Sequence, residues 1–282
     1  MIKKLITYLP FNRMREIETY FRKNIDNLKT ENNIVYVDNV FNPAQLEILK
    51  NNYDYVEIRG GNWNDRNLCF LQIIEDSINN PEDILVVDSD NVLNPNFQEI
   101  DETLTNKGYA FYNVADLSWE TGKIDKRSKK IDSIIVNNHR IDVYTYKIYG
   151  IWREIFFIGP KQAVRLSPDL LKRINRQALL DLKKALNKID IRLRNYISDE
   201  TSIGFVYYYS GIKYIPWIAG TEHIYHSSSP LTDKDTFRML RAITLAKLGK
   251  ELFGHGYNRI YWFYFRYKLA YIARSVSIML KP

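Results

Sequence analysis

Short apolar runs alternate with longer amphipathic stretches through the first hundred residues, and this order predicts repeated strand-helix units. The apolar runs have the length of strands and lie at residues 4–9, 33–37, 53–58 and 84–87. Between them, residues 13–28 and 69–74 carry apolar side chains at helical spacing, and Pro43 suits the first turn of a helix over 44–50. Asn64 or Asp65 is a plausible cap for the helix through 69–74. Strand-helix units joined by short connections predict a right-handed parallel sheet.

The pattern after Pro95 predicts a more irregular second half. Polar, basic residues at 119–132 predict a solvent-exposed loop or hairpin. The expected helices lie at 97–104, 168–193 with a break near Asn187, and 203–209. The expected strands lie at 109–114, 134–136, 141–148, 155–158 and 213–218.

Two aspartates directly follow the most apolar of the predicted strands. Residues 84–87 are all aliphatic, which is typical of a strand buried on both faces, and Asp88 and Asp90 come next. Ligands of open α/β sheets bind at the carboxyl ends of the strands, so these side chains are expected at a binding site. Two close carboxylates suit Mg²⁺ or Mn²⁺. The alternative is that both aspartates only form the turn.

Two further groups of polar residues are candidates for chemistry. Asp199 and Glu200 open the predicted helix 203–209, where acids also serve simply to complement the helix dipole. His223 and His226 follow the predicted strand 213–218 and are two of only four histidines. A histidine near a carboxylate pair is a candidate metal ligand, although a structural role is the alternative.

The composition is that of an ordinary globular protein. The chain has 282 residues, of which 45% are hydrophobic and 26% charged. Its single cysteine, Cys69, excludes an internal disulfide framework and a cysteine-rich zinc site, which predicts a cytoplasmic location. The apolar run at residues 4–9 is too short for a signal peptide and is read as the first strand.

Charge is concentrated at the carboxyl-terminal end. Residues 233–282 hold ten Lys and Arg against three Asp and Glu, which equals the whole net charge of +7. Arg259, Arg266 and Arg274 are seven and eight residues apart among aromatic residues, a pattern of helices that lie on anionic membrane surfaces. We therefore divide the chain into a catalytic domain, 1–232, and a basic aromatic helical segment, 233–282. Packing of this segment on the domain or in a dimer is the alternative.

In their order along the chain, the short motifs resemble those of GT-A fold nucleotide-sugar glycosyltransferases, especially the large inverting family of that fold. The resemblance covers about residues 4–228. It is carried by residues 7–12, Asp38, residues 62–67 with Arg66-Asn67, Val87-Asp88-Ser89-Asp90, Asp199-Glu200 and Tyr225-His226. The family more usually has Glu-Asp at the acidic pair, which leaves open whether Asp199 or Glu200 is the base. The metal-binding histidine is likewise His226 or His223.

The resemblance implies a GT-A type α/β fold with a mostly parallel nucleotide-binding sheet flanked by helices, a donor-binding half at about 1–115 and an acceptor-binding half at about 116–232. It implies transfer of a hexose from a UDP- or GDP-sugar to a glycan acceptor, with Mn²⁺ or Mg²⁺. The basic carboxyl-terminal segment in turn predicts a lipid-linked acceptor and a location on the inner face of the cell membrane. Inversion is expected and retention stays open; no nucleic-acid partner is expected. The implied metal ligands are Asp88, Asp90 and His226 or His223, with Asp199 or Glu200 as base. The implied nucleotide-sugar-binding residues are Thr7, Tyr8, Leu9, Pro10, Asp38, Arg59, Arg66, Asp88 and Ser89.

Two other functions fit parts of the pattern. A haloacid-dehalogenase-like phosphatase also has an Asp-x-Asp after an apolar strand, and would use Asp88 as nucleophile, Asp90 as acid, and Lys161 and Asp199 as later motif members. Against it, that motif normally lies on the first strand of its fold, and the usual threonine is Val92 here. A non-catalytic protein that binds a nucleotide or a membrane would not depend on Asp199 or Glu200.

Overall fold

The computed structural model describes residues 1–115, 128–148, 158, 161–223 and 234–254, together with six helical residues near the carboxyl end: Trp262, Phe265, Arg266, Lys268, Leu269 and Ile272. The strands of this part are β1 (Lys4–Pro10), β2 (Asn32–Asp38), β3 (Glu57–Gly60), β4 (Ile84–Val87), β5 (Asn91–Leu93), β6 (Tyr112–Ala115), β7 (Lys129–Val136), β8 (His139–Lys147), β9 (Ala163–Leu166), β10 (Tyr214–Ala219) and β11 (Thr221–His223).

The helices begin with a 3₁₀ turn at Phe11–Arg13 and a π-helical turn, η2 (Ile17–Phe21), that continues into α1 (Arg22–Leu28). The others are α2 (Pro43–Asn52), α3 (Arg66–Asn79), α4 (Phe97–Asn106), α5 (Pro168–Arg173), α6 (Arg176–Asn187), α7 (Ile191–Arg194), α8 (Asp199–Tyr209) and α9 (Lys234–Phe253). None of the helices in these described residues is long and apolar enough to cross a membrane.

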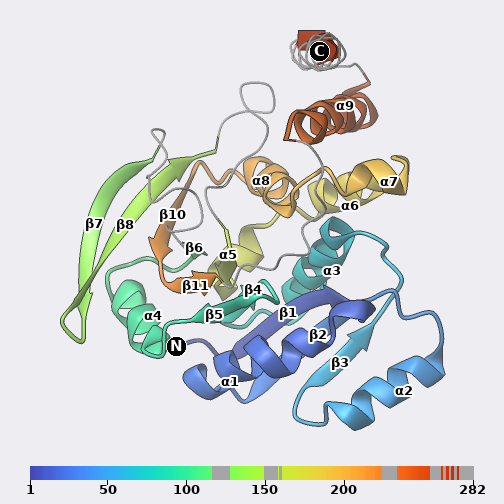
Figure 1. The fold of residues 1–282 in the computed structure, drawn as a ribbon. Helices are drawn as coiled ribbons and strands as arrows, with labels where there is room; N and C mark the ends of the chain where they lie inside the picture. The colour runs from blue at the N-terminus through green and yellow to red at the C-terminus, as the bar shows by residue number, and fades with distance from the viewer. Residues whose placement is uncertain are drawn as a thin grey trace, which may run out of the picture.

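A nine-stranded mixed sheet runs through the described part of the molecule (Figure 1). Its strand order is β3-β2-β1-β4-β9-β6-β10-β8-β7. The four strands from β3 to β4 are parallel, whereas β9 is antiparallel to both of its neighbours and β8 is antiparallel to β10 and β7. A separate two-stranded ladder pairs β5 with β11.

Helices cover both faces of this sheet, because successive residues of its buried strands point in opposite directions. In β1, Ile6 and Tyr8 join a core that contains residues of α3, α5, α6 and α8, while Leu5 and Leu9 join a core with residues of η2, α1, α2 and α4. Cys69 is buried in the first of these cores. The expected α/β fold with a large sheet flanked by helices is confirmed.

The structure differs from the expected elements in the second half of the chain. The run of parallel strands is interrupted after β4 by the antiparallel strand β9, which was not expected at all, and parallel pairing recurs only between β6 and β10 among the described strands. The expected helix over 168–193 is three helices, with an additional break after Arg173. Residues 129–132, assigned to the exposed loop, form the beginning of β7. The rest of that loop, and residues 155–157 of an expected strand, lie outside the described residues.

A buried arginine explains why the sequence pattern did not reveal β9. Arg165 is 1% exposed in the middle of this strand, where an apolar residue would be expected. Its Nε donates to Asp101 Oδ1 at 2.6 Å and its Nη2 to Asp83 Oδ1 at 2.7 Å. A buried charge is tolerated when it is paired and hydrogen-bonded, so these two acids permit the arginine inside the sheet.

Helix α9 packs on the rest of the fold. Ala242, Leu245, Ala246 and Leu248 are buried, and the Thr244 hydroxyl donates to the Leu193 carbonyl at 3.2 Å. In Figure 1, α9 lies beside α6, α7 and α8. The first twenty residues of the basic segment therefore contribute to the core around α6 and α7.

Asn24 fixes the strand that follows the aspartate motif. Its side chain is 1% exposed, and its Nδ2 donates to the Asn91 carbonyl while its Oδ1 accepts from the Leu93 amide, each at 2.8 Å. Because β5 pairs with β11 along one edge, Asn24 supplies backbone partners on the other. Asn27, one turn further on, makes one weaker contact, from Nδ2 to the Leu93 carbonyl at 3.2 Å.

We expect Asn24→Ala to lower the free energy of unfolding by about 2–3 kcal/mol, since it leaves a buried amide and a buried carbonyl without partners. Asn27→Ala, which removes a single part-buried hydrogen bond, is the matched control and should cost about 1 kcal/mol or less. Urea denaturation monitored by tryptophan fluorescence measures both. Equal losses for the two variants would show that Asn24 is not the anchor of β5.

Candidate active site

The candidate site lies at the carboxyl end of the parallel strands. Asp88 directly follows β4, and its amide donates to the Gln162 carbonyl at 2.8 Å, which ties the turn to the segment before β9. Parallel pairing of β1 with β2 and β4 brings the ends of all three strands to this edge. The edge therefore has the position at which open α/β sheets bind ligands.

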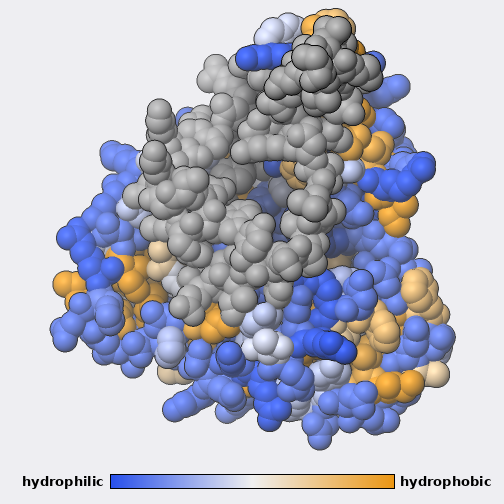
Figure 2. Space-filling model, viewed as in Figure 1, coloured by the Kyte–Doolittle hydropathy of each residue, from blue (hydrophilic) through white to orange (hydrophobic). Residues whose placement is uncertain are grey.

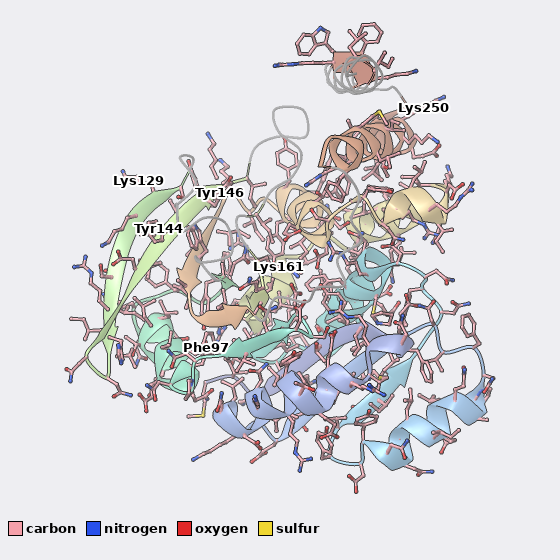
Figure 3. All side chains as sticks on the ribbon, viewed as in Figure 1. Phe97, Lys129, Tyr144, Tyr146, Lys161 and Lys250 are labelled. Carbon is pink, nitrogen blue, oxygen red and sulfur yellow. The ribbon has the colours of Figure 1, made fainter. Side chains whose placement is uncertain are left out.

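A buried lysine joins the residues at this edge. Lys161 Nζ donates to Asp88 Oδ1 and to Asp199 Oδ2, each at 2.7 Å, and to the Tyr8 hydroxyl at 3.1 Å. The Tyr8 hydroxyl also lies 3.1 Å from Asp88 Oδ1 and hydrogen-bonds to Asp199. Lys161 is 6% exposed and lies near the centre of the molecule in Figure 3. Four residues far apart in the sequence thus form one hydrogen-bonded cluster.

The two acids that begin α8 have different environments. Asp199 is 2% exposed, and although burial opposes its ionisation, Lys161 and Arg66 hold its pKa well below the usual range. Glu200 is half-buried, and burial, followed by the negative charge of Asp199, raises its pKa to about 7. A general base works best with a pKa near the operating pH. Asp199 is therefore part of the lysine cluster, whereas Glu200 is the acid whose pKa is raised.

The second aspartate of the motif faces a different cation. Asp90 Oδ2 lies 3.5 Å from Arg13 Nη2, and its Oδ1 accepts from Asn91 Nδ2 at 3.0 Å. Ser89, between the two aspartates, is buried and its hydroxyl donates to Glu16. Glu16 also pairs with Arg13, so Ser89 and Asp90 share the Arg13–Glu16 ion pair, whereas Asp88 belongs to the lysine cluster.

The residues at the motif fit a divalent ion that is shared with a phosphate ligand. Asp88 and Asp90 supply hard carboxylate oxygens, and Mg²⁺ is often held by one or two carboxylates together with substrate phosphates. Among the described residues, no group of three or more His, Cys, Asp and Glu side chains is suited to a metal. The β11–β5 ladder places the backbone of His223 opposite Asn91, next to Asp90. The side chain of His223 and all of His226 lie outside the described part of the chain.

Asp38 organises the loop between β3 and α3. Its carboxylate accepts from the backbone amides of Asn39, Trp63, Asn64 and Asp65 at 2.8–3.1 Å. This loop delivers Arg66, whose side chain is 57% exposed and whose Nη2 lies 3.7 Å from Asp199 Oδ1. The predicted nucleobase contact of Asp38 stays a prediction, and its observed contacts are all with the loop.

The remaining predicted binding residues have structural contacts. The Thr7 hydroxyl is buried and donates to the Val87 carbonyl at 2.8 Å, which links β1 to β4. Leu9 lies in the core, and Pro10 ends β1. Arg59 contacts Glu57, Tyr36 and Asp76, a set that shares no member with the lysine cluster.

Two further residues belong to this region. Lys161 was considered only for the phosphatase alternative, although it is the centre of the observed cluster. Arg241 of α9 donates from Nη2 to the Ser198 hydroxyl at 3.2 Å, at the residue that precedes α8. No local sequence signal marks either residue, because their partners are distant in the chain.

No family model matches the chain, and no curated protein matches it in sequence. Among solved structures, it is similar to residues 1–349 of S. aureus TarS, with 13% identity, a TM-score of 0.42, and coverage of 90% of this chain and 72% of that one. It is similar to the galactosyltransferase LgtC with donor and acceptor sugar analogs, at 10% identity, TM-score 0.41, and 74% and 70% coverage.

The similar structures also include nucleotidyltransferases. One is 4-diphosphocytidyl-2C-methyl-D-erythritol synthase from Anaerococcus prevotii, at 12% identity and TM-score 0.42, covering 86% of this chain and 95% of that one. Similarities at this level assign neither a family nor an activity to the chain.

We expect activity to fall as the pH drops below about 7, because Glu200 must be deprotonated to accept a proton. The limiting slope corresponds to a tenfold loss for each pH unit. Glu200→Gln should reduce turnover by at least 10²-fold while nucleotide affinity changes less than about threefold, since a base acts on the acceptor. Steady-state rates between pH 5.5 and 8.5 and calorimetry with UDP provide the measurements. An unchanged pH profile in a still active Glu200→Gln variant would assign the base elsewhere.

Proposed function

We propose that this protein is a metal-dependent glycosyltransferase of GT-A type, which transfers a sugar from a nucleoside-diphosphate sugar to an acceptor hydroxyl. The observation that supports it most strongly is that Lys161 joins Asp88, in the aspartate motif at the end of β4, to Asp199, which precedes Glu200 at the start of α8. The aspartate motif suits a metal-diphosphate group, and the acidic pair of α8 contains a carboxylate with the pKa of a general base.

In the proposed reaction, Asp88, Asp90 and either His223 or His226 would hold Mn²⁺ or Mg²⁺. The bound ion would neutralise negative charge on the departing diphosphate. Arg66, exposed next to Asp199, contributes positive charge on the same side of the cluster. These groups bind and orient the donor.

Glu200 accepts the proton of the acceptor hydroxyl as its oxygen attacks the anomeric carbon and the bond to the diphosphate breaks. A single displacement of this kind inverts the anomeric configuration, and it needs only one base on the acceptor side. Asp199 remains ionised beside Lys161, so its proposed role is to make Glu200 a stronger base than an isolated glutamate by raising its pKa.

A phosphatase is the second candidate, because the structure brings Asp88, Lys161 and Asp199 together as that function would require. Burial of Lys161 and the hydrogen bonds to Asp88 Oδ1 argue against it, since a phosphoryl group would need access to both. Hydrolysis of p-nitrophenyl phosphate that is lost in Asp88→Asn, with no affinity for UDP or GDP, would favour the phosphatase.

We expect UDP or GDP to bind with an affinity at least tenfold higher when Mn²⁺ is present than in EDTA, because an ion held by Asp90 would supply positive charge for the diphosphate. Asp90→Asn should remove this difference. Asp132→Asn is the control, because Asp132 lies in β7 and pairs with Lys107. This variant should bind as the wild type does. Isothermal titration calorimetry measures all three proteins. Equal affinity with and without Mn²⁺ in the wild type would contradict metal dependence.

We further propose that the basic aromatic segment docks on an anionic membrane, which supports a lipid-linked acceptor. Trp262, Phe265, Leu269 and Ile272 are 48–59% exposed, and their spacing of three and four residues places them on one helical face. Arg266 lies over the Trp262 ring at 5.8 Å. Hydrophobic atoms are visible at this end of the molecule in Figure 2. Exposed apolar residues beside cations match an anionic lipid surface.

The full chain should co-sediment with vesicles that contain 30% phosphatidylserine and should be released by 0.5 M NaCl, as expected for about 1 kcal/mol per basic residue. Trp262→Ser/Phe265→Ser should weaken this binding at least tenfold, because two exposed aromatic anchors are lost. Phe41→Ser removes an aromatic residue that is 67% exposed elsewhere and is the control. Binding that is equal in all three proteins would contradict docking by this face.

A further inference from the structure

The residue that follows Lys161 is held by two backbone hydrogen bonds. The carbonyl of Gln162 accepts from the Asp88 amide at 2.8 Å, and the amide of Gln162 donates to the Val114 carbonyl at 2.8 Å. Directly afterwards, β9 pairs with β4 and β6 on its two edges. The lysine therefore lies two residues before a strand that is paired on both edges.

The ammonium group is sealed from solvent by residues of the core. The side chain is 1% exposed, and Nζ lies 5.5 Å from the centre of the Tyr8 ring and 5.4 Å from that of Phe70. A group so enclosed does not touch a substrate. Its effect on a reaction must pass through the residues that it holds.

Those residues come from both halves of the site. Asp88 belongs to the aspartate motif, whereas Asp199 opens α8 and immediately precedes Glu200. Without the cation between them, the buried carboxylate of Asp199 and the partly buried one of Asp88 would repel each other and lose their shared partner. With it, the first turn of α8 has a fixed distance from the end of β4.

We infer that Lys161 is a positioning residue, which sets the first turn of α8, and with it Glu200, relative to the Asp88–Asp90 motif. The effect of Lys161 on catalysis rests on the proposed function, whereas its effect on the position of α8 rests on its hydrogen bonds to Asp88 and Asp199. Displacement of a reacting group by about 1 Å costs on the order of 10²-fold in rate. Loss of Lys161 should therefore reduce turnover more than donor binding.

The same strand offers a matched control. Arg165 is also 1% exposed and also bridges two carboxylates, those of Asp83 and Asp101. Its hydrogen-bond partners in the described part of the chain are Asp83, Asp101 and the Ala110 carbonyl, none of which is a proposed catalytic or binding residue. Arg165→Met thus removes a buried cation from the fold but not from the site.

The test compares Lys161→Met, Lys161→Arg and Arg165→Met in the full chain. Both methionine variants should lower the melting temperature. The measured reaction is hydrolysis of the UDP- or GDP-hexose that the wild type cleaves. Lys161→Met should lower its kcat by about 10²-fold while KM stays within about threefold of the wild-type value. Lys161→Arg should have a kcat about tenfold higher than that of Lys161→Met. Arg165→Met should keep kcat within about threefold. A kcat loss shared by both methionine variants, or a Lys161→Met defect confined to KM, would overturn the inference.

Hydrogen–deuterium exchange provides a readout that does not depend on activity. Amides of α8 (Asp199–Tyr209) should exchange at least tenfold faster in Lys161→Met than in Arg165→Met. Equal exchange would overturn the positioning role even if the enzyme is a glycosyltransferase. The proposed function would be contradicted separately if the wild-type protein neither bound nor cleaved any UDP- or GDP-hexose. In that case, faster exchange in Lys161→Met than in Arg165→Met would still support the positioning role of Lys161.

Discussion

The ammonium group of Lys161, placed between the carboxylates of Asp88 and Asp199, is the interaction on which the arrangement of the site depends. Removing one partner of a buried ion pair typically costs about 3–5 kcal/mol, since the remaining charge has neither water nor a counter-ion. The pairing therefore couples the position of α8 to that of β4. It also separates the roles of two adjacent acids, because Asp199 is held ionised while Glu200 has a pKa of about 7.

The antiparallel strand β9 makes this arrangement possible. It lies between β4 and β6. Lys161 precedes its first residue by two positions, and Arg165 is its third residue. Arg165 binds Asp101 of α4 and Asp83 before β4, so the same strand is fixed by ionic contacts at two points. A strand that accepts buried cations must have acids on its neighbours, and both sets of acids are present here.

Local patterns revealed most of the first half of the fold, because β1, β2 and β4 are apolar runs next to amphipathic helices. The third strand was expected at 53–58, whereas β3 begins at Glu57 and has a single aliphatic residue, Ile58. Asp88, Asp90, Asp199 and Glu200 were recognisable for a similar reason, since acids at the end of a strand or the start of a helix have a local signature. The role of Lys161 had none, because its partners lie 73 and 38 residues away. The choice between Asp199 and Glu200 depended on those same distant contacts.

The position of α9 has a consequence for any attempt to work with part of this protein. Charge alone suggests a boundary after residue 232, yet a fragment ending there would lack Leu245 and Leu248 and would expose the apolar surface that they cover on α6 and α7. It would also lose Arg241, whose side chain donates a hydrogen bond to the hydroxyl of Ser198, the residue that precedes α8. The shortest soluble catalytic fragment should therefore extend through Phe253, the last residue of α9.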